Sequence, residues 1–262
     1  MSDNKTNGKT SGKKSLKKKK KIKRIIKTII LLALIIGGFC FALISPIFNV
    51  TEINVTGNEQ ISSDTIISLS QLEIGQNLFR FNRIKVSNEI KTNAYIENVK
   101  IQRKIPNKIE ITIEERKRDY NVEFLNGYAY INNQGYILEI AEQKLELPVI
   151  KGISTPQEQI VEGNRLDDED LEKLETVIQI MNICKNYDLD TKISSIDITN
   201  KSNYIINMDE EKKTIQLGND SNLRNKILYV PAILTENKEK EGTIYLNGDI
   251  NGDFKPRFRE KV

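Results

Sequence analysis

The chain has 262 residues, a formal net charge of +4 and no histidine, and 38% of its residues are hydrophobic. The absence of histidine excludes Ser-His-Asp triads, imidazole metal ligands and catalysis by a histidine acid or base. The two cysteines, Cys40 and Cys184, are too few for a disulfide-rich scaffold.

The positive charge is concentrated at the N-terminus. Residues 1–27 hold twelve Lys/Arg and one acid, Asp3, so residues 28–262 carry a net charge of −7. We interpret residues 1–27 as a cytoplasmic head whose lysines lie beside anionic lipid headgroups. No aromatic side chains are interleaved with these lysines to stack on nucleotides, so we expect no nucleic-acid partner.

Residues 28–48 predict a transmembrane helix. The segment from Ile29 to Phe48 reads IILLALIIGGFCFALISPIF, and about 20 apolar residues suffice to cross a bilayer. This segment is longer than the core of a signal peptide and no small-residue cleavage motif follows it, which favours an uncleaved anchor. Because Lys and Arg beside a span stay in the cytoplasm, we expect a single-pass type II protein with its C-terminal domains outside the cell membrane.

Residues 49–117 predict a small domain of order β-α-α-β-β. Residues 50–56 alternate as a strand does, and Ser62 or Ser63 caps a short helix that ends near Ser70. Asn82 caps a second helix. Two further strands are expected at 95–103 and 108–115. Two helices on one face of a three-stranded sheet would form its core.

Residues 118–247 predict a second, mixed α/β domain. A helix is expected from Asp167–Asp170 to about Tyr187, and another from about Asn219 until Pro231 ends or bends it. Residues 248–262 are expected to be a flexible C-terminal tail. The expected strands are 120–124, 127–132, 136–140, 148–152, 193–199, 204–208, 214–217 and 243–247.

The acidic clusters do not predict a catalytic or metal site. Residues Asp167–Asp170 stand where a helix begins, and acids there interact favourably with the helix dipole. Glu114 and Glu115 are adjacent in a strand, so their carboxylates point to opposite faces, and we expect Arg116 to anchor a domain junction. Glycine-rich phosphate-binding motifs are absent. We therefore expect no catalytic, cofactor-binding or metal-binding residues.

An ordered series of short motifs runs along the chain: INVTGN (53–58), GQNLF (75–79), RKIPNKI (103–109), EER (114–116), YIN (130–132), GYIL (135–138), LPVIKG (147–152), TIQLG (214–218) and GTIYLN (242–247). In this order and at these spacings the series resembles the bacterial cell-division protein family FtsQ, called DivIB in Gram-positive bacteria. The resemblance covers nearly the whole chain and implies an α+β fold: a single transmembrane helix, a POTRA domain of β-α-α-β-β order, and a second mixed α/β domain called the β domain.

The resemblance implies a non-enzymatic divisome scaffold at the division septum. Such a scaffold binds FtsB/DivIC-like and FtsL-like single-pass proteins and helps control septal peptidoglycan synthesis during cell division. It needs no cofactor and no small-molecule substrate. The alternatives are a membrane-anchored export or assembly chaperone that uses its POTRA domain, and a membrane-anchored cell-wall enzyme or inhibitor.

The last strand is the expected partner-binding edge. An edge strand offers unpaired N–H and C=O groups to which a partner segment can add as a further strand. We expect Ile244→Pro to abolish partner binding while the first domain still folds. The predicted partner-binding residues are Thr243, Ile244, Tyr245, Leu246 and Asn247.

Overall fold

The computed structural model describes residues 11–125, 127–248 and 255–261, with side chains from residue 21 onward. Residues 1–10 of the predicted head, and residues 249–254 and 262 of the predicted tail, lie outside the described residues. Contacts divide the chain into two compact units. The first runs to Thr56 and includes Ser63–Glu89 and Lys100–Thr112; the second comprises Gly57–Ser62, Ile90–Val99 and the chain from Ile113 onward.

The first unit begins with the long helix α1 (Ser11–Ile44), whose segment Lys21–Ile44 is long and apolar enough to cross a membrane. The helix ends four residues before the predicted boundary at residue 48. Ser45 has extended backbone angles, as is usual for a residue before proline, and Pro46–Phe48 form the 3-10 turn η1.

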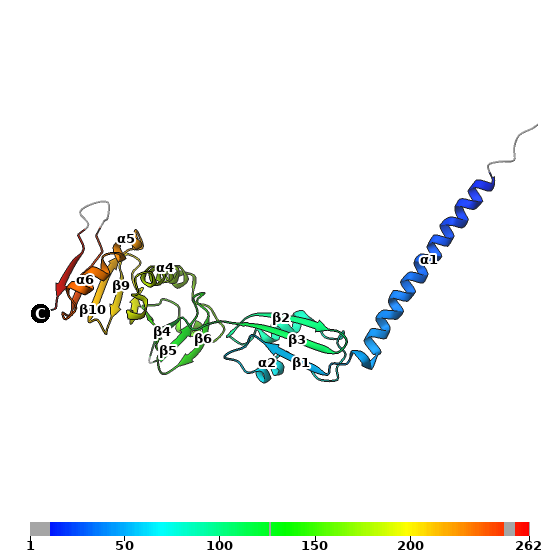
Figure 1. Ribbon diagram of the computed structural model, residues 1–262, viewed down its shortest axis with the longest axis horizontal. Coiled ribbons are helices and arrows are strands. Elements are labelled where there is room, and N and C mark those ends of the chain that lie inside the picture. Colours follow the sequence, from blue (N-terminus) through cyan, green and yellow to red (C-terminus); the bar gives the residue numbers. More distant parts are fainter. Residues whose placement is uncertain (1–10, 126, 249–254, 262) are drawn as a thin grey trace, which may run out of the picture. The chain divides into compact units, whose positions relative to one another are not determined.

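A three-stranded sheet follows, in the order β1-β3-β2 (Figure 1). Its elements confirm the predicted β-α-α-β-β order: β1 (Glu52–Thr56), α2 (Ser63–Ser70), α3 (Arg83–Ile90), β2 (Ile96–Lys104) and β3 (Lys108–Glu115). β1 pairs with β3 in parallel. The buried apolar side chains that the first unit contributes include Ile66, Leu72, Leu78, Val86, Ile109 and Ile111.

The second unit contains a nine-stranded sheet of order β12-β11-β10-β9-β8-β7-β4-β5-β6. The pairs β4–β7, β7–β8 and β10–β11 are parallel and the other pairs are antiparallel. The strands are β4 (Tyr120–Phe124), β5 (Gly127–Ile131), β6 (Ile137–Ala141), β7 (Val149–Lys151), β8 (Ser195–Asp197), β9 (Tyr204–Met208), β10 (Lys213–Gly218), β11 (Gly242–Tyr245) and β12 (Arg257–Glu260).

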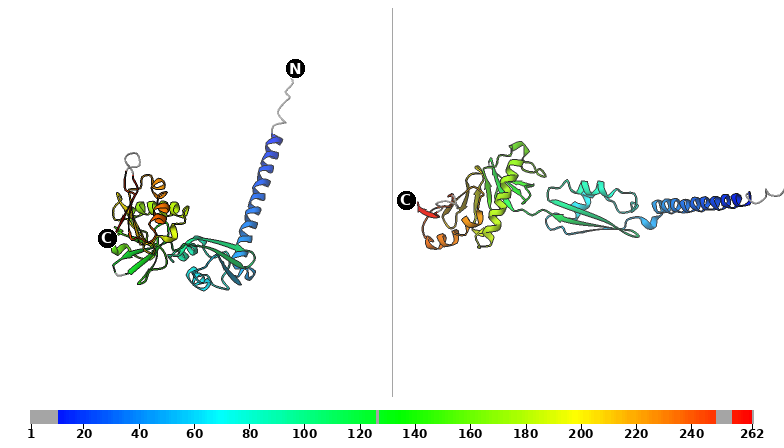
Figure 2. Two further views of the ribbon diagram at one scale, coloured as in Figure 1. Left: turned by 60° about the vertical axis from the view of Figure 1, so that its left-hand side comes forward. Right: turned by 90° about the horizontal axis from the view of Figure 1, so that it is seen from above.

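Three helices share one hydrophobic core with this sheet: α4 (Asp168–Lys185), α5 (Leu223–Ile227) and α6 (Val230–Glu236) (Figure 1, Figure 2). The sequence predicted a single helix here that Pro231 ends or bends. Pro231 instead stands in the first turn of α6, where its missing N–H removes no helical hydrogen bond. The short 3-10 turns η2 (Gln157–Gln159) and η3 (Asp190–Lys192) complete the unit.

The acidic start of α4 is a structural cap, as predicted. Asp167 is the N-cap and accepts a 2.8 Å hydrogen bond from the Asp170 N–H. The Asp170 carboxylate is fully buried and accepts hydrogen bonds from the backbone N–H and the hydroxyl of both Ser154 and Thr155, at 2.7–3.0 Å. Burial alone would raise the pKa of Asp170, but these donors outweigh it and the pKa is lowered.

Candidate functional site

The predicted partner-binding residues lie on and just after β11. Thr243, Ile244 and Tyr245 are in the strand, and Leu246 and Asn247 follow it. Ile244 and Leu246 are fully buried in the core, whereas Thr243 and Tyr245 are half-buried on the other face of the sheet. The side chains thus alternate as the sequence indicated.

The expectation that β11 is the edge of the sheet is wrong. β11 pairs in parallel with β10 on one side and antiparallel with β12 on the other. Part of the predicted flexible tail, Arg257–Glu260, therefore forms the edge strand β12 (Figure 1).

Local contacts explain why β12 pairs here. Phe258 packs against the hydrophobic core. Gly242 is paired with Glu260, and a Cβ on Gly242 would collide with the Arg259 carbonyl and the Phe258 ring. The Arg257 guanidinium lies 5.0 Å from the centre of the Tyr245 ring. β12 is thus held by an apolar side chain, a close backbone approach and a cation–π contact.

Successive residues of a strand direct their backbone N–H and C=O groups to opposite sides, and this alternation identifies the groups at the open edge. The N–H groups of Gly242 and Leu246 donate to carbonyls of the β10 side. The Lys261 N–H donates to Glu241 on the other side of β11, at 2.9 Å. Since pairing alternates along an antiparallel ladder, the backbone groups of Arg257 and Arg259 face β11. Those of Phe258 and Glu260 face outward.

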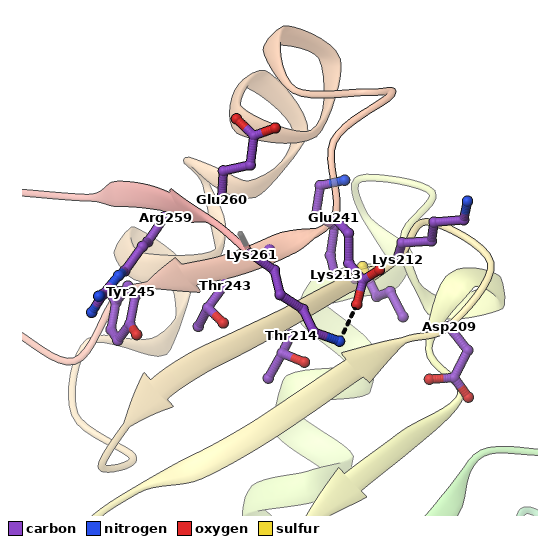
Figure 3. Close-up of a pocket in the computed structure, with 12 residues that line it drawn as sticks. Asp209, Lys212, Lys213, Thr214, Glu241, Thr243, Tyr245, Arg259, Glu260 and Lys261 are labelled. Carbon is purple, nitrogen blue, oxygen red and sulfur yellow. Dashed lines mark hydrogen bonds and ion pairs between the residues drawn. The ribbon is translucent and has the colours of Figure 1, made fainter.

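The edge is basic on one side. Arg259 and Lys261 point to one side of β12 and Glu260 to the other (Figure 3). Lys261 forms a 2.5 Å ion pair with Glu241, and Arg257 and Arg259 are exposed. The same side carries a depression lined by Asp209, Lys212, Lys213, Thr214, Glu241, Thr243, Tyr245, Arg259 and Lys261, among others (Figure 3). This arrangement suits an added strand with acidic side chains on that side.

Glu114, Glu115 and Arg116 take separate structural roles. The Glu115 carboxylate accepts hydrogen bonds from the N–H groups of Gln60 and Ile61, at 2.7 and 3.0 Å. Glu114 is exposed. The two carboxylates therefore do not converge, as the sequence predicted.

Arg116 and Arg118 organise a polar cluster in the second unit. Arg116 donates to the carbonyls of Ala94 and Ile96, and its guanidinium lies 4.0 Å from the centre of the Tyr136 ring. Sequence reasoning singled out Arg116 but missed its aromatic partner. A tyrosine far along the chain gives no local signal of a stacked guanidinium.

Arg118 contacts the buried side chain of Tyr95. The Tyr95 hydroxyl donates a 2.6 Å hydrogen bond to Glu139 and accepts one of 2.7 Å from Arg118. Burial and the bond to Glu139 raise the pKa of Tyr95 to about 12. Arg118 and Glu139 also form a 3.3 Å ion pair. The phenol thus stays protonated at neutral pH and acts as a donor.

The remaining reactive groups are buried or dispersed. Among the described residues, no three His, Cys, Asp or Glu side chains gather where they could hold a metal ion. Cys184 is buried in α4, and burial raises the pKa of its thiol to about 12. Such a thiol remains protonated and unreactive in the folded chain.

Two family models match the chain. Residues 48–116 match "POTRA domain, FtsQ-type" and residues 122–247 match "Cell division protein FtsQ/DivIB, C-terminal". The cell division protein DivIB of Clostridium tetani is 29% identical over 225 residues, which cover 86% of this chain and 83% of that protein.

Other relatives match over shorter stretches. DivIB of Clostridium acetobutylicum is 34% identical over 59% of this chain, and the match spans 61% of that protein. DivIB of Bacillus subtilis is 33% identical over 40% of this chain, and the match spans 36% of that protein. The strand β12 lies beyond the matched C-terminal model, which ends at residue 247.

Proposed function

The chain belongs to the FtsQ/DivIB family of bacterial cell division proteins, and we propose that it is a non-enzymatic scaffold of the divisome. One N-terminal apolar helix is compatible with a single-pass membrane anchor. The lysine-rich head keeps the N-terminus in the cytoplasm. The POTRA and C-terminal domains then stand on the outer face of the membrane at the septum, where they help control peptidoglycan synthesis.

The partners are FtsB/DivIC-like and FtsL-like single-pass proteins, bound by strand addition. The observation that carries this proposal is the open edge of the nine-stranded sheet at β12. The outward backbone groups of Phe258 and Glu260 can pair with an incoming strand. The exposed Arg257 and Arg259 favour an acidic partner segment.

Two predicted contact residues, Thr243 and Tyr245, remain part of this proposal. Their side chains are half-buried beside the edge strand, on the side that carries the depression (Figure 3). A partner strand that pairs with β12 is separated from Thr243 and Tyr245 by β12 itself. Only long side chains of the partner, extending across β12, would reach these two residues. Ile244 and Leu246 instead support the site from within the core.

The variant Ile244→Pro does not test this edge. Ile244 lies two residues from both Gly242 and Leu246, so its backbone groups point to the same side as theirs, toward β10. Proline there would break a ladder inside the sheet. Glu260→Pro is the sharper change, because the Glu260 N–H faces outward and its side chain is exposed.

The test is a pull-down of the tagged full chain from detergent-solubilised native membranes, with bound proteins identified by mass spectrometry. Two small single-pass coiled-coil proteins should be recovered with the wild-type chain and with Glu260→Ala, and lost with Glu260→Pro. A diffuse set of unfolded exported proteins would favour the chaperone alternative. Equal recovery of the two partners by all three chains would refute the edge assignment.

A further inference from the structure

Three isoleucines lie exposed on separate loops of the first unit. Ile47 of η1 is 61% exposed, Ile74 in the loop after α2 is 62% exposed, and Ile105 in the turn between β2 and β3 is 70% exposed. Isolated exposed apolar residues need no explanation. These three differ because all of their loops bind one short segment of the chain, residues 48–51.

Backbone hydrogen bonds bring the three loops together. The Leu78 N–H donates to Phe48, and Val50 exchanges hydrogen bonds with the loop of Ile74 through Gly75 and Gln76, at 2.7–2.8 Å. The Thr51 N–H donates to Asn107, two residues after Ile105, at 2.9 Å. We name the group Ile47, Ile74 and Ile105 the apolar tip.

The apolar tip stands next to the end of α1. Only Ser45–Asn49 separate Ile44 from Val50, and six extended residue steps span at most about 21 Å. Contacts shorten this reach: the Asn77 amide donates to the Ala42 carbonyl at 3.0 Å. The Phe48 ring lies 6.5 Å from that of Phe41 and 5.2 Å from that of Phe79. The segment that binds the three loops of the tip therefore starts within about 21 Å of the end of α1.

Exposed cations accompany the tip. Arg103 donates to the carbonyls of Leu78 and Phe81, at 2.7 and 2.8 Å, which fixes the start of α3 beside the end of β2. Arg80 and Arg83 flank this anchored loop and are exposed. Neither forms an ion pair with a carboxylate among the described residues.

Neighbouring lysines differ from these arginines. Lys104 and Lys108 are paired with Glu110 and Glu52, at 2.7 and 2.5 Å. Their charge is therefore already neutralised locally. One exposed acid, Glu73, lies beside Ile74. Arg80 and Arg83 thus supply two unpaired positive charges near the tip.

We propose that the apolar tip docks on the outer leaflet of the membrane that α1 spans, with Arg80 and Arg83 binding the phosphates of anionic phospholipids. This inference rests on the proposed membrane anchoring. Isoleucine side chains enter the interfacial region, and each arginine near an anionic surface strengthens docking by about fivefold. Docking fixes the first unit against the membrane instead of leaving it on a free tether.

The test measures how deeply the tip enters lipid. Full-length protein is reconstituted into phosphatidylcholine vesicles, alone or mixed with phosphatidylglycerol, that contain a lipid-borne quencher. A fluorescent thiol label is placed at Ile74→Cys or Ile105→Cys in a Cys40→Ser background. Val161→Cys is the matched control, because Val161 is an apolar residue that is 50% exposed in the second unit. Buried Cys184 stays unlabelled.

Labels at Ile74→Cys and Ile105→Cys should be quenched several-fold more than the label at Val161→Cys, and more strongly with phosphatidylglycerol. Arg80→Gln with Arg83→Gln should remove the dependence on phosphatidylglycerol. Lys91→Gln with Lys117→Gln, which removes two exposed charges elsewhere, should preserve it. Equal quenching at all three positions would overturn the proposal.

A label on native Cys40 separates the two proposals. If Cys40 is quenched by lipid while the tip labels are not, the anchor stands and the docking is wrong. If Cys40 is not quenched either, α1 does not insert, and both the anchoring and the docking are refuted.

Discussion

Ile244 of β11 lies directly opposite Phe258 of β12 in an antiparallel register. Because β12 pairs with β11 in this way, β11 is an inner strand of the sheet and β12 is the edge strand. It also divides the roles of the two strands. β11 contributes core side chains, whereas the outward backbone groups and most exposed charges at this end of the sheet belong to β12.

Blocking the outer backbone groups of β12 should weaken partner binding. Glu260→Pro removes one outward N–H, and the loss of such a hydrogen bond costs about 1–3 kcal/mol, so we expect the affinity for partners, and with it their recovery, to fall by about fivefold or more. Glu260→Ala removes the same side chain and its exposed 3.2 Å ion pair with Lys240 but keeps the N–H. Recovery is measured by quantitative mass spectrometry of the pull-down.

Deleting residues 255–262 distinguishes the two candidate edges. If partners add to β12, the truncated chain should lose them. If β12 merely shields β11, truncation should preserve or increase binding, because it would free the backbone groups of Thr243 and Tyr245. We expect loss, and increased recovery from the truncated chain would restore β11 as the docking strand.

Gly242→Ala should loosen the pairing of β12 with β11 although it changes no residue of β12. The added methyl would collide with the Arg259 carbonyl and the Phe258 ring, and overpacking of this kind costs about 1–3 kcal/mol. Hydrogen exchange should show faster exchange of the amides of Arg257 and Arg259. Gly38→Ala in α1 tests whether any such change would do the same, since the Gly38 backbone is helical and a Cβ there meets no atom within 4 Å. Unchanged exchange in Gly242→Ala would show that the close approach is not what holds β12.

The sequence predicted the helices and strands better than it predicted which strands lie next to each other in the sheet. The alternation of Ile109, Ile111 and Ile113 and the caps at Asp167 and Asn82 were sufficient for β3, α4 and α3. These signals are local. β12 was missed because RFRE contains a single apolar residue, Phe258, and is otherwise charged. Its pairing depends on Gly242 and the Tyr245 ring, which are distant in sequence.

Long-range polar contacts escaped prediction for the same reason. Tyr95 and Glu139 are 44 residues apart, and neither position carries a local pattern that points to the other. The apolar tip was also invisible, because Ile47, Ile74 and Ile105 are single residues on three loops. Only the backbone hydrogen bonds to residues 48–51 reveal that their loops lie together.

Tyr95→Phe should destabilise the second unit and flatten its alkaline pH dependence. The lost hydroxyl removes the bonds to Glu139 and Arg118, which we expect to lower the free energy of unfolding by about 1–2 kcal/mol. The pKa of Tyr95 is raised from 10.0 to about 12 in the folded chain. The folded state therefore holds this proton more tightly. The stability it contributes is complete below pH 10 and is lost as the pH rises to about 12.

The measurement is denaturation followed by circular dichroism across this pH range, with phenolate absorbance as a second observable. Tyr120 also has a pKa raised to about 12, through burial and the nearby Asp119, so the variant should keep part of the alkaline dependence. Tyr128→Phe is the control, because Tyr128 is half-buried and its hydroxyl makes no hydrogen bond among the described residues. Identical alkaline profiles for wild type and Tyr95→Phe would contradict the assignment.

Asp170→Asn should lower stability most at neutral pH. The amide keeps one acceptor oxygen but loses the charge that faces four donors of Ser154 and Thr155. The expected loss is about 2–3 kcal/mol at pH 7. The matched control is Asp168→Asn, in the same turn of α4 but exposed, which should cost less than about 0.5 kcal/mol.

The acid dependence provides the second, independent readout for Asp170. Because its pKa is lowered in the folded chain, the unfolded chain binds this proton more readily. The stability it contributes is present above the ordinary carboxyl pKa of 3.8 and is lost as the pH falls through the lower folded value. Asp170→Asn should therefore narrow the difference in unfolding free energy between pH 5 and pH 2, while Asp168→Asn should leave it unchanged. If both variants retain the acid dependence of the wild type, another carboxylate is responsible for it, and the hydrogen bonds from Ser154 and Thr155 to Asp170 contribute no pH-dependent stability.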